Sequence, residues 1–493
     1  MLHQLLHEIG YRGRQLQWVI VVCLCGLQAK TQTNRTTLND CFVIAQKNNV
    51  LISQAKTSLL ARQYSMQAEK QSYLPKVDLL ASYSYLSKPL EINLQTVRDG
   101  IITGSSLQAV NTANQVYKEI TGQNISSDAA QRIESTSRTI INAAYPNYNP
   151  PLSKQSYFLA GLGVRQPIYL GNKLRTVQDV ATAEFHAGQV NLDLVQKDIK
   201  FAIALQYIRI MYLNAILQKE NTIVSSLQKN DNYANEMVKE QILPPYQRNW
   251  AKVALIQGKT RLSNQQLEKQ NALVELNKLL GAPLDSVIII TDTLIYKPTK
   301  IDTVNNEFYQ TNPGYQFVNS KSALAEATLK GSKSFSLPNI FAVGNLNLYQ
   351  NDLPVTIPPW FVGVEMQWTI FNGTQTIKRV KAAQQLLEES KLATENAKSL
   401  LEMQLKVAIN KMQSLQNDVA ALDSARQEAN TTFSLIEERM RNNLSSPKDV
   451  NDALLIKEEI EKAYYTAVLG YYLAMAEYFN IVGTPEKISA YLQ

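Results

Sequence analysis

Two aspartates three residues apart, Asp449 and Asp452, are the residues of this sequence most suited to binding ions. They lie in the stretch NNLSSPKDVNDALL, residues 442–455, just beyond Pro447. Residues three apart share one face of a helix, so both carboxylates are expected on the same face. Such a pair attracts cations where several copies converge. Alternatively, aspartates in a first helical turn only complement the helix dipole, and the local sequence leaves both interpretations open.

The sequence offers little for catalysis or for binding metals and nucleotides. His3 and His7 lie at the N-terminus, and His186 has no Cys or acidic cluster at metal-ligand spacing around it. The GLG stretch at residues 161–163 lacks a nucleotide-binding turn. Lys and Glu are interspersed without a basic stripe, so the net charge of +7 does not indicate nucleic acid. We therefore expect no enzyme, no cofactor, no metal site and no nucleic-acid partner.

The first 33 residues have the pattern of a signal peptide. Arg12 and Arg14 precede the apolar run WVIVVCLCGL, residues 18–27, which is too short to span a bilayer but has the length of a signal-peptide core. The alternative is a short buried helix. After cleavage Cys41 would be the only cysteine left, so no intrachain disulfide is expected. The cell envelope is the predicted destination.

Four short segments alternate between apolar and polar or small residues. Beyond the first 33 residues no segment has about 18 consecutive apolar residues, so a membrane-inserted form would have to use β-strands. The segments begin near Val77, Phe158, Ile340 and Trp360, and Pro, Asn or Gly bounds each of them. One face of each is apolar with aromatic ends, which is typical of strands in an outer-membrane barrel. A soluble β-sandwich produces the same alternation.

Long helical tracts follow the second and fourth segments. Between residues 172 and 243 there is no proline, and apolar or small residues recur at spacings of three and four. Some 70 residues at about 1.5 Å each give roughly 105 Å of helix. Because this length is more than three times the hydrocarbon thickness of a bilayer, such a helix would project far from any membrane.

The chain contains one structural unit twice. The stretches RQPIYLGNK, residues 165–173, and MQWTIFNGT, residues 366–374, place Gly171 and Gly373 at a separation of 202 positions (373 − 171). The stretches LLGAP and IVGTP, which begin at residues 279 and 481, keep the same separation. A spacing kept without a gap over more than a hundred residues indicates a tandem repeat.

The predicted organisation follows from this repeat. A signal peptide (1–33) precedes the first repeat (34–283), which consists of a helix, a strand, a long extracellular loop (87–155), a second strand and a helical hairpin. A linker (284–302) leads to the second repeat (303–485), which consists of a helix, two strands and a helical hairpin. A C-terminal tail (486–493) follows. Within the long loop, residues 126–144 have a helical pattern. Outer-membrane barrels place their long loops outside the cell, so this loop is expected to cover the exit.

The order and spacing of these elements resemble the TolC-like outer-membrane efflux proteins, the outer membrane factors, over nearly all of the chain after residue 33. The stretches that carry the resemblance are TTLNDCFVIAQKNN (36–49), SYLPKVDLLASYSY (72–85), the two strand-Gly-helix junctions, and GTPEK (483–487). The resemblance implies a homotrimer in which each protomer lends four β-strands to one twelve-stranded barrel, while long coiled-coil helices form a periplasmic tunnel. Four strands cannot close a barrel alone, which independently requires several chains.

The resemblance also implies a function. The chain would be a passive exit duct, in the lipid of the outer membrane, for a tripartite efflux or type I secretion system. Its partners would be a periplasmic adaptor protein and an inner-membrane pump of the RND or ABC type. The alternative is a periplasmic coiled-coil adaptor or scaffold that never enters lipid, but this role leaves the four strands and the repeat unexplained.

Asp449 and Asp452 match an acidic pair that lines the closed periplasmic mouth in the resembling family. Three copies would bring six carboxylates to one axis. The first repeat has Gln247 and Trp250 at the equivalent positions, so the ring would belong to one hairpin only.

Other sites follow from the same resemblance. The tyrosine and arginine that tie the mouth shut in some relatives are not matched at Met440 and Ser445. From the repeat, and not from the resemblance, Gly171 and Gly373 are expected at barrel-helix junctions, where a side chain clashes or the backbone needs an unusual φ, so Val at either would impair trimer assembly. The predicted adaptor-docking tips are Leu243, Pro244, Pro245, Leu444, Ser445, Ser446 and Pro447.

Overall fold

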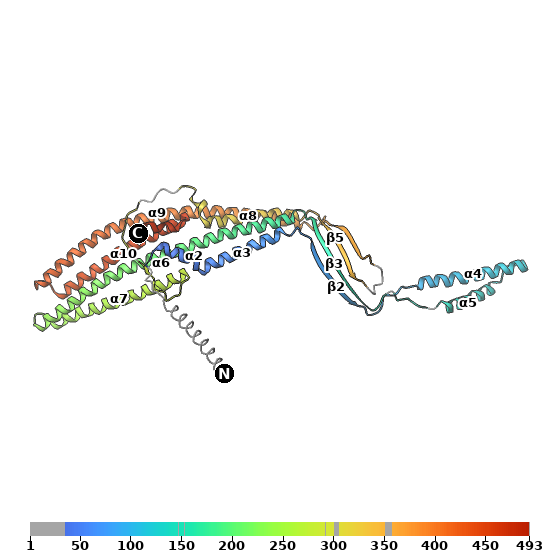
Figure 1. Cartoon of the computed structure of the whole chain (residues 1–493), viewed down its shortest axis with the longest axis horizontal. Coiled ribbons are helices and arrows are strands. Elements are labelled where there is room, and N and C mark those ends of the chain that lie inside the picture. The colour runs from blue at the N-terminus through green and yellow to red at the C-terminus, as the bar shows by residue number, and fades with distance from the viewer. Residues whose placement is uncertain are drawn as a thin grey trace, which may run out of the picture. The chain divides into compact units, whose positions relative to one another are not determined.

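The computed structural model describes residues 35–145, 147–151, 153–290, 292–299, 305–350 and 357–492. The predicted signal peptide lies outside the described residues. The chain forms two compact units (Figure 1). One comprises Met1–Gln67, Gln178–Lys330 and Arg379–Gln493, and the other comprises Ala68–Val177 and Gly331–Lys378. Each unit therefore takes segments from both sequence repeats.

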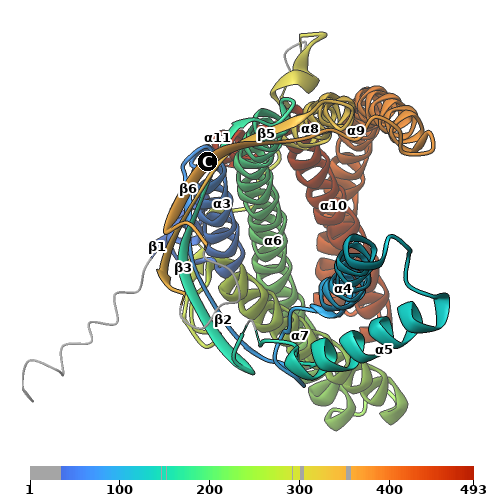
Figure 2. The same cartoon turned by 90° about the vertical axis from the view of Figure 1, so that its right-hand side faces the viewer.

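The smaller unit contains a four-stranded antiparallel sheet in the order β2-β3-β5-β6. Its strands are β2 (Lys76–Tyr85), β3 (Ser156–Tyr169), β5 (Asn339–Tyr349) and β6 (Trp360–Gln367), which confirms all four predicted segments. The pairing between β3 and β5 shifts register between Ala160 and Gly161 and again between Pro167 and Tyr169. Such irregularities bend and twist a sheet, and Figure 2 shows the curved strands.

The two faces of this sheet differ in chemistry. On one face Arg165 pairs with Glu365 at 3.5 Å, and its guanidinium lies 3.9 Å from the ring centre of Phe341. The other face carries large apolar side chains that are exposed in the single chain, including Leu79 at 68% and Val362 at 75%. A large exposed apolar face marks a surface that contacts lipid or another protein.

The larger unit is built on two helical hairpins of equal dimensions. The first consists of α6 (Lys173–Lys239) and α7 (Pro245–Leu280), and the second of α9 (Gln375–Arg441) and α10 (Pro447–Val482). The long helices have 67 residues each and the short ones 36 each. Every bound of the second hairpin is the bound of the first shifted by 202 positions (375 − 173, 447 − 245). The sequence separation of 202 is thus also the separation of the helix ends.

The core of the larger unit is rich in tyrosine. Tyr207 on α6 and Tyr471 and Tyr472 on α10 are among its largest fully buried side chains. The Tyr207 hydroxyl donates to Asp292 Oδ2 at 2.9 Å, and that of Tyr472 donates to the carbonyl of Ile295 at 2.6 Å. These bonds fasten part of the predicted linker to the helices, because buried hydroxyls require partners.

Shorter elements complete the larger unit. They are β1 (Arg35–Thr36), α2 (Leu38–Asn48), α3 (Val50–Lys70), β4 (Ile289–Ile290), η1 (Phe308–Thr311), α8 (Pro313–Ser334), η2 (Pro485–Ile488) and α11 (Ser489–Leu492). The last residues of α3 and α8 belong to the smaller unit. Strand β1 pairs in parallel with β4. Among the described helices α6 alone is long and apolar enough by composition to cross a membrane, and half of its most apolar window is buried inside the protein.

The segment 87–155 is not an irregular loop. It contains α4 (Gln95–Thr121) and α5 (Ser127–Ala144), which form a hairpin. Helix α5 matches the predicted helical stretch, and its N-cap Ser126 accepts a hydrogen bond from the Ala129 amide. Helix α4 was not predicted, because its Gly, Ser, Thr and Asn residues have low helix propensity.

The two junction glycines have the unusual backbone that the sequence predicted. Gly171 has φ +58° and Gly373 has φ +66°, and the residue after each, Asn172 and Thr374, also has positive φ. Their surroundings differ. A Cβ at Gly171 would lie 2.5 Å from Leu337 Cβ, whereas a Cβ at Gly373 would meet no atom of the described chain within 4 Å.

We predict that Gly171→Val lowers oligomer yield more than Gly373→Val does. Both variants bear the strain of positive φ, about 1–2 kcal/mol, but only Gly171→Val adds overpacking against Leu337, about 1–3 kcal/mol. Yield of detergent-stable oligomer and its thermal stability measure the effect. Gly344→Ala is the matched control, since its Cβ would make only ordinary contacts. Wild-type behaviour of both valine variants would contradict the assigned role.

Candidate functional site

Asp449 caps the helix at the tip of the second hairpin. Ser446 is the N-cap of α10, and its hydroxyl accepts from the Asp449 amide at 3.3 Å. In return, Asp449 Oδ2 accepts from the amide and the hydroxyl of Ser446 at 2.8 and 2.9 Å. The backbone hydrogen bond, followed by the side-chain bond, lowers the pKa of Asp449. The capping role is therefore present, and the residue is also exposed and charged.

Asp452 lies one turn further along α10 and forms an ion pair. Its Oδ2 is 2.5 Å from Lys448 Nζ, and both side chains are more than half exposed. The hydrogen bond to Asp452 raises the pKa of Lys448. The pair has the spacing i, i+4, which the sequence already contained, yet Lys448 was missed as a member of the site. Arg439 lies at this tip as well, where its guanidinium donates to Ser445 Oγ and to the Leu444 carbonyl, each at 3.3 Å, so the two aspartates have two cationic side chains nearby.

The tip of the first hairpin has no carboxylate at the equivalent positions and exposes several apolar side chains, while its Arg248 lies 3.8 Å from Asp231. Gln247 and Trp250 occupy the positions equivalent to the two aspartates, and Pro244 is an N-cap without a capping side chain. Trp250 is 58% exposed and continues a stripe with Tyr246, Val253 and Ile256 on the first turns of α7. Exposed aromatic and aliphatic stripes of this kind suit contact with another helix.

The predicted docking residues are not equally accessible. Leu444 is 64% exposed, and Pro244 and Pro245 are exposed as well. Leu243, Ser445 and Ser446 are half-buried, and Pro447 is buried. Pro447 is thus part of the packing at the tip rather than of its surface.

Hydrogen bonds tie the two tips to each other. The Tyr233 hydroxyl on α6 donates to the Met440 carbonyl at 2.8 Å and lies 2.9 Å from Asn443 Oδ1. Asn230 Nδ2, also on α6, donates to the Pro447 carbonyl and to Asn451 Oδ1. No tyrosine was matched at Met440 itself, but a tyrosine of the other hairpin contacts its backbone. This contact could not be predicted from the sequence, because it depends on how α6 is aligned with α9, and these helices are far apart in the chain.

A cluster of buried charges lies between α6, α7 and α10. Glu220 and Glu461 are each 5% exposed. Arg261 contacts Glu458 at 2.5 Å, and Lys219 lies 3.7 Å from Glu461. Burial and then the charge of Glu458 raise the pKa of Glu220 to about 7, against the opposing effects of Arg261 and Lys462. In the part of the chain that the structure describes, no group of His, Cys, Asp and Glu side chains has the geometry of a metal site.

Comparisons with known proteins identify the fold. No protein-family model matches the sequence, and no curated protein sequence matches it. Solved structures do match. The outer membrane protein VceC of Vibrio cholerae has a TM-score of 0.65 at 14% identity, covering 91% of this chain and 96% of VceC. The outer membrane channel CmeC of Campylobacter jejuni has a TM-score of 0.69 at 13% identity, covering 95% of this chain and 94% of CmeC.

The open state of the MtrE outer membrane channel of Neisseria gonorrhoeae is similar as well. Its TM-score is 0.68 at 14% identity, covering 91% of this chain and 89% of MtrE. At such low identity these likenesses concern the fold. They confirm the predicted fold class of long helices combined with four antiparallel strands.

We predict that Glu220→Gln makes stability less dependent on pH. The pKa of Glu220 is raised from 4.5 to about 7 in the folded protein, so its contribution is fully present below 4.5 and lost as pH rises through about 7. Glutamine resembles the protonated form and retains that contribution. At pH 8 the variant should be more stable than the wild type by up to about 3 kcal/mol, and the difference should nearly vanish at pH 4.5.

Thermal unfolding of the detergent-solubilised protein between these pH values measures the difference. The matched control is Glu275→Gln, since Glu275 is 58% exposed on α7. A constant difference between Glu220→Gln and wild type across this range would show that Glu220 does not titrate there.

Proposed function

We propose that this chain, which has the fold of the TolC-like outer-membrane channels, is the exit duct of a tripartite efflux or type I secretion system. The proposal rests on one observation, the way in which the four-stranded sheet is joined to the two longest helices. A four-stranded sheet with an exposed apolar face continues, at two equivalent junctions, into two helices of 67 residues. The sheet would lie in the outer membrane and the helices would extend into the periplasm. The duct is passive and needs no catalytic residue.

The edges of the sheet support an oligomer. Strands β2 and β6 are the two edges, and an edge strand in lipid would leave its backbone groups unpaired. Pairing β2 of one copy with β6 of the next satisfies both edges at once. Three copies then give twelve strands, and the family resemblance selects this homotrimer. The exposed residues of β2 and β6, such as Leu79 and Val362, would face lipid.

The tips of the helices would form the periplasmic mouth. Three copies of Asp449 and Asp452 would surround one axis, with Lys448 paired with Asp452 and Arg439 held at the same tip by Ser445 and Leu444. The bonds from Tyr233 and Asn230 to the second hairpin would hold the tips of each protomer together. Breaking these bonds is what opening of the mouth would require.

The tips would also dock the periplasmic adaptor. Leu444 and the stripe that includes Tyr246 and Trp250 are exposed and apolar, which suits the helical hairpins of such proteins. An inner-membrane pump of the RND or ABC type would supply the cargo through this adaptor. The outer membrane is the proposed location of the sheet.

Membrane fractionation distinguishes the duct from the alternative of a periplasmic coiled-coil scaffold. Both roles accommodate long hairpins, but only the duct uses the exposed apolar sheet. The duct should remain in the outer-membrane fraction after a carbonate wash and should run as a heat-modifiable oligomer. Release by carbonate as a monomer would contradict the duct and favour the scaffold.

We predict that divalent and trivalent cations added from the periplasmic side lower the conductance of the purified trimer in planar bilayers. Two carboxylates at about 5–6 Å repel by roughly 3 kcal/mol at an effective dielectric constant near 20, so bound cations would stabilise a closed ring. Replacing Asp449 and Asp452 with Ala should remove most of the block. The double Asn variant should do the same while retaining hydrogen-bonding groups at the helix cap.

A control pair is available on the first hairpin. Replacing Glu236 and Glu240 with Gln also removes two exposed carboxylates near a tip, but it should leave the block unchanged. If cations lower the conductance equally in the wild type and in the Asp449 and Asp452 variants, these aspartates only cap the helix and pair with Lys448.

A further inference from the structure

The hairpin of α4 and α5 leaves the sheet at the end opposite to the long helices. It connects Tyr85, the last residue of β2, to Ser156, the first residue of β3. Helix α6 begins after the other end of β3, at Lys173. In the proposed duct the hairpin is therefore on the extracellular side.

The hairpin is joined to the sheet by ordered backbone. The Leu86 amide donates to the Gln155 carbonyl at 2.7 Å, and the Ile92 amide donates to the Pro150 carbonyl at 3.1 Å. At the base of α4, Arg98 Nε donates to the Tyr145 carbonyl at 2.8 Å. The pairing of β2 with β3 thus continues toward the helices, so the position of the sheet constrains the position of the hairpin.

The hairpin lacks a core of its own. In α4, with 27 residues, only Ile102 and Ser106 are buried, and α5, with 18 residues, has no buried residue in its described part. Helices in proteins are stabilised mainly by burying an apolar face. Two helices with so little buried surface require further packing partners.

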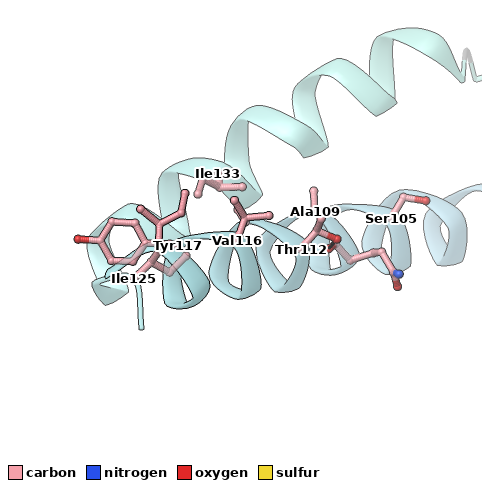
Figure 3. A pocket seen from close by; sticks show the side chains of 10 residues that line it. Ser105, Ala109, Thr112, Val116, Tyr117, Ile125 and Ile133 are labelled. Carbon is pink, nitrogen blue, oxygen red and sulfur yellow. Dashed lines mark hydrogen bonds between the residues drawn. The ribbon is translucent and has the colours of Figure 1, made fainter. Parts of the chain in front are cut away.

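Helix α4 also lacks the charged face of a solvated helix. Between Asp99 and Lys118 it has no charged residue on any side. An open groove of about 810 Å³ follows it on the side of α5 (Figure 3). Its lining includes Ser105, Thr112, Val116, Ile120, Ile125 and Ile133. Val116 and Ile120 are 50% and 78% exposed, so the groove is an unoccupied apolar surface of the single chain.

A second face of α4, without charge between Asp99 and Lys118, lies outside this groove. Gly100 and Gly104 are four residues apart, hence on one face, and a Cβ at either would meet no described atom within 4 Å. Each glycine costs a helix about 1 kcal/mol relative to alanine. Nothing within the described chain makes use of their small size, whereas close approach of another helix would.

We infer that three copies of the α4–α5 hairpin pack on one another and form a helical cap over the outer end of the duct. The inference rests on the proposed function, because the trimer brings the three hairpins together. In a threefold ring each copy contacts its two neighbours through two different surfaces. The groove around Val116 and the face of Gly100 and Gly104 provide two such surfaces.

A further copy of this chain fits the groove better than a lipid or a foreign protein does. The walls combine apolar side chains with uncharged polar ones such as Ser105 and Thr112, and the face of Gly100 and Gly104 on a neighbouring α4 has small residues that permit close approach to them. The sheet that anchors each hairpin would also keep the copies at a local concentration in the millimolar range. Weak contacts are sufficient under these conditions.

Cross-linking of the full-length protein in the outer membrane tests the inference. The variant Asn111→Cys with Val116→Cys places one thiol on the face of Gly104, seven residues away, and one in the groove. Cys41 is buried, and Cys23 and Cys25 would be removed with the predicted signal peptide, so the native thiols should not interfere. A short bis-maleimide should join the chains into a covalent trimer. The control, Asn111→Cys with Arg132→Cys on the exposed side of α5, should yield about tenfold less.

The other outcomes are equally informative. Adding Ile120→Glu to the first variant should abolish the cross-link, because it buries an unpaired carboxylate in the apolar contact, without dissociating the detergent-stable trimer. An intact trimer with equal cross-linking in the variant and its control, or with the thiols joined to another protein, would overturn the cap and leave the proposed duct unaffected. A protein that is monomeric by light scattering would refute both.

Discussion

The unpaired edges of the four-stranded sheet are the constraint on which the rest of the proposed structure depends. Strands β2 and β6 each present a row of backbone amides and carbonyls, and every such group left unpaired in lipid costs several kcal/mol. No side chain of the protomer can offset a cost of this size. In the proposed oligomer, joining edges between copies would remove this cost, and the resulting ring would bring the helix tips of the copies together and the α4–α5 hairpins together.

The tandem repeat preserves geometry while chemistry diverges. The bounds of both helical hairpins coincide at a shift of 202 positions, and positive φ recurs at Gly171 and Gly373. In contrast, the buried Tyr471 and Tyr472 of α10 correspond to Lys269 and Gln270 in α7. The length of the helices and the position at which each hairpin reverses depend on backbone conformation, which both copies of the repeat need. The side chains on the surface of each hairpin depend instead on the segments that contact it, and these differ between the copies. The two tips differ in the same way, since Asp449 and Asp452 of the second correspond to Gln247 and Trp250 of the first.

Only features that depend on neighbouring residues could be predicted from the sequence. The four strands, the long helices and the positive φ at the junctions depend on alternation, on helix-forming composition and on glycine, all of which are visible in the sequence. Helix α4 was missed because its residues are weak helix formers that rely on packing. The contact of Tyr233 with Met440 joins residues 207 positions apart, and such register between helices is not encoded locally. The pairing of Lys448 with Asp452 was readable, since it lies within one helical turn.

The two interpretations of the aspartates at the second tip are compatible. Capping fixes the direction of Asp449 and, through the bonds from Ser446, lowers its pKa. A carboxyl with a lowered pKa remains ionised through the range in which most carboxyls titrate, so mild acidification does not remove its charge. Lys448 pairs with Asp452, whereas Asp449 has no cationic partner at hydrogen-bond distance among the described contacts and is reached only by the more distant charges of Lys448 and Arg439. In a ring of three such tips, the ligand that can relieve the remaining repulsion is therefore a cation rather than a proton.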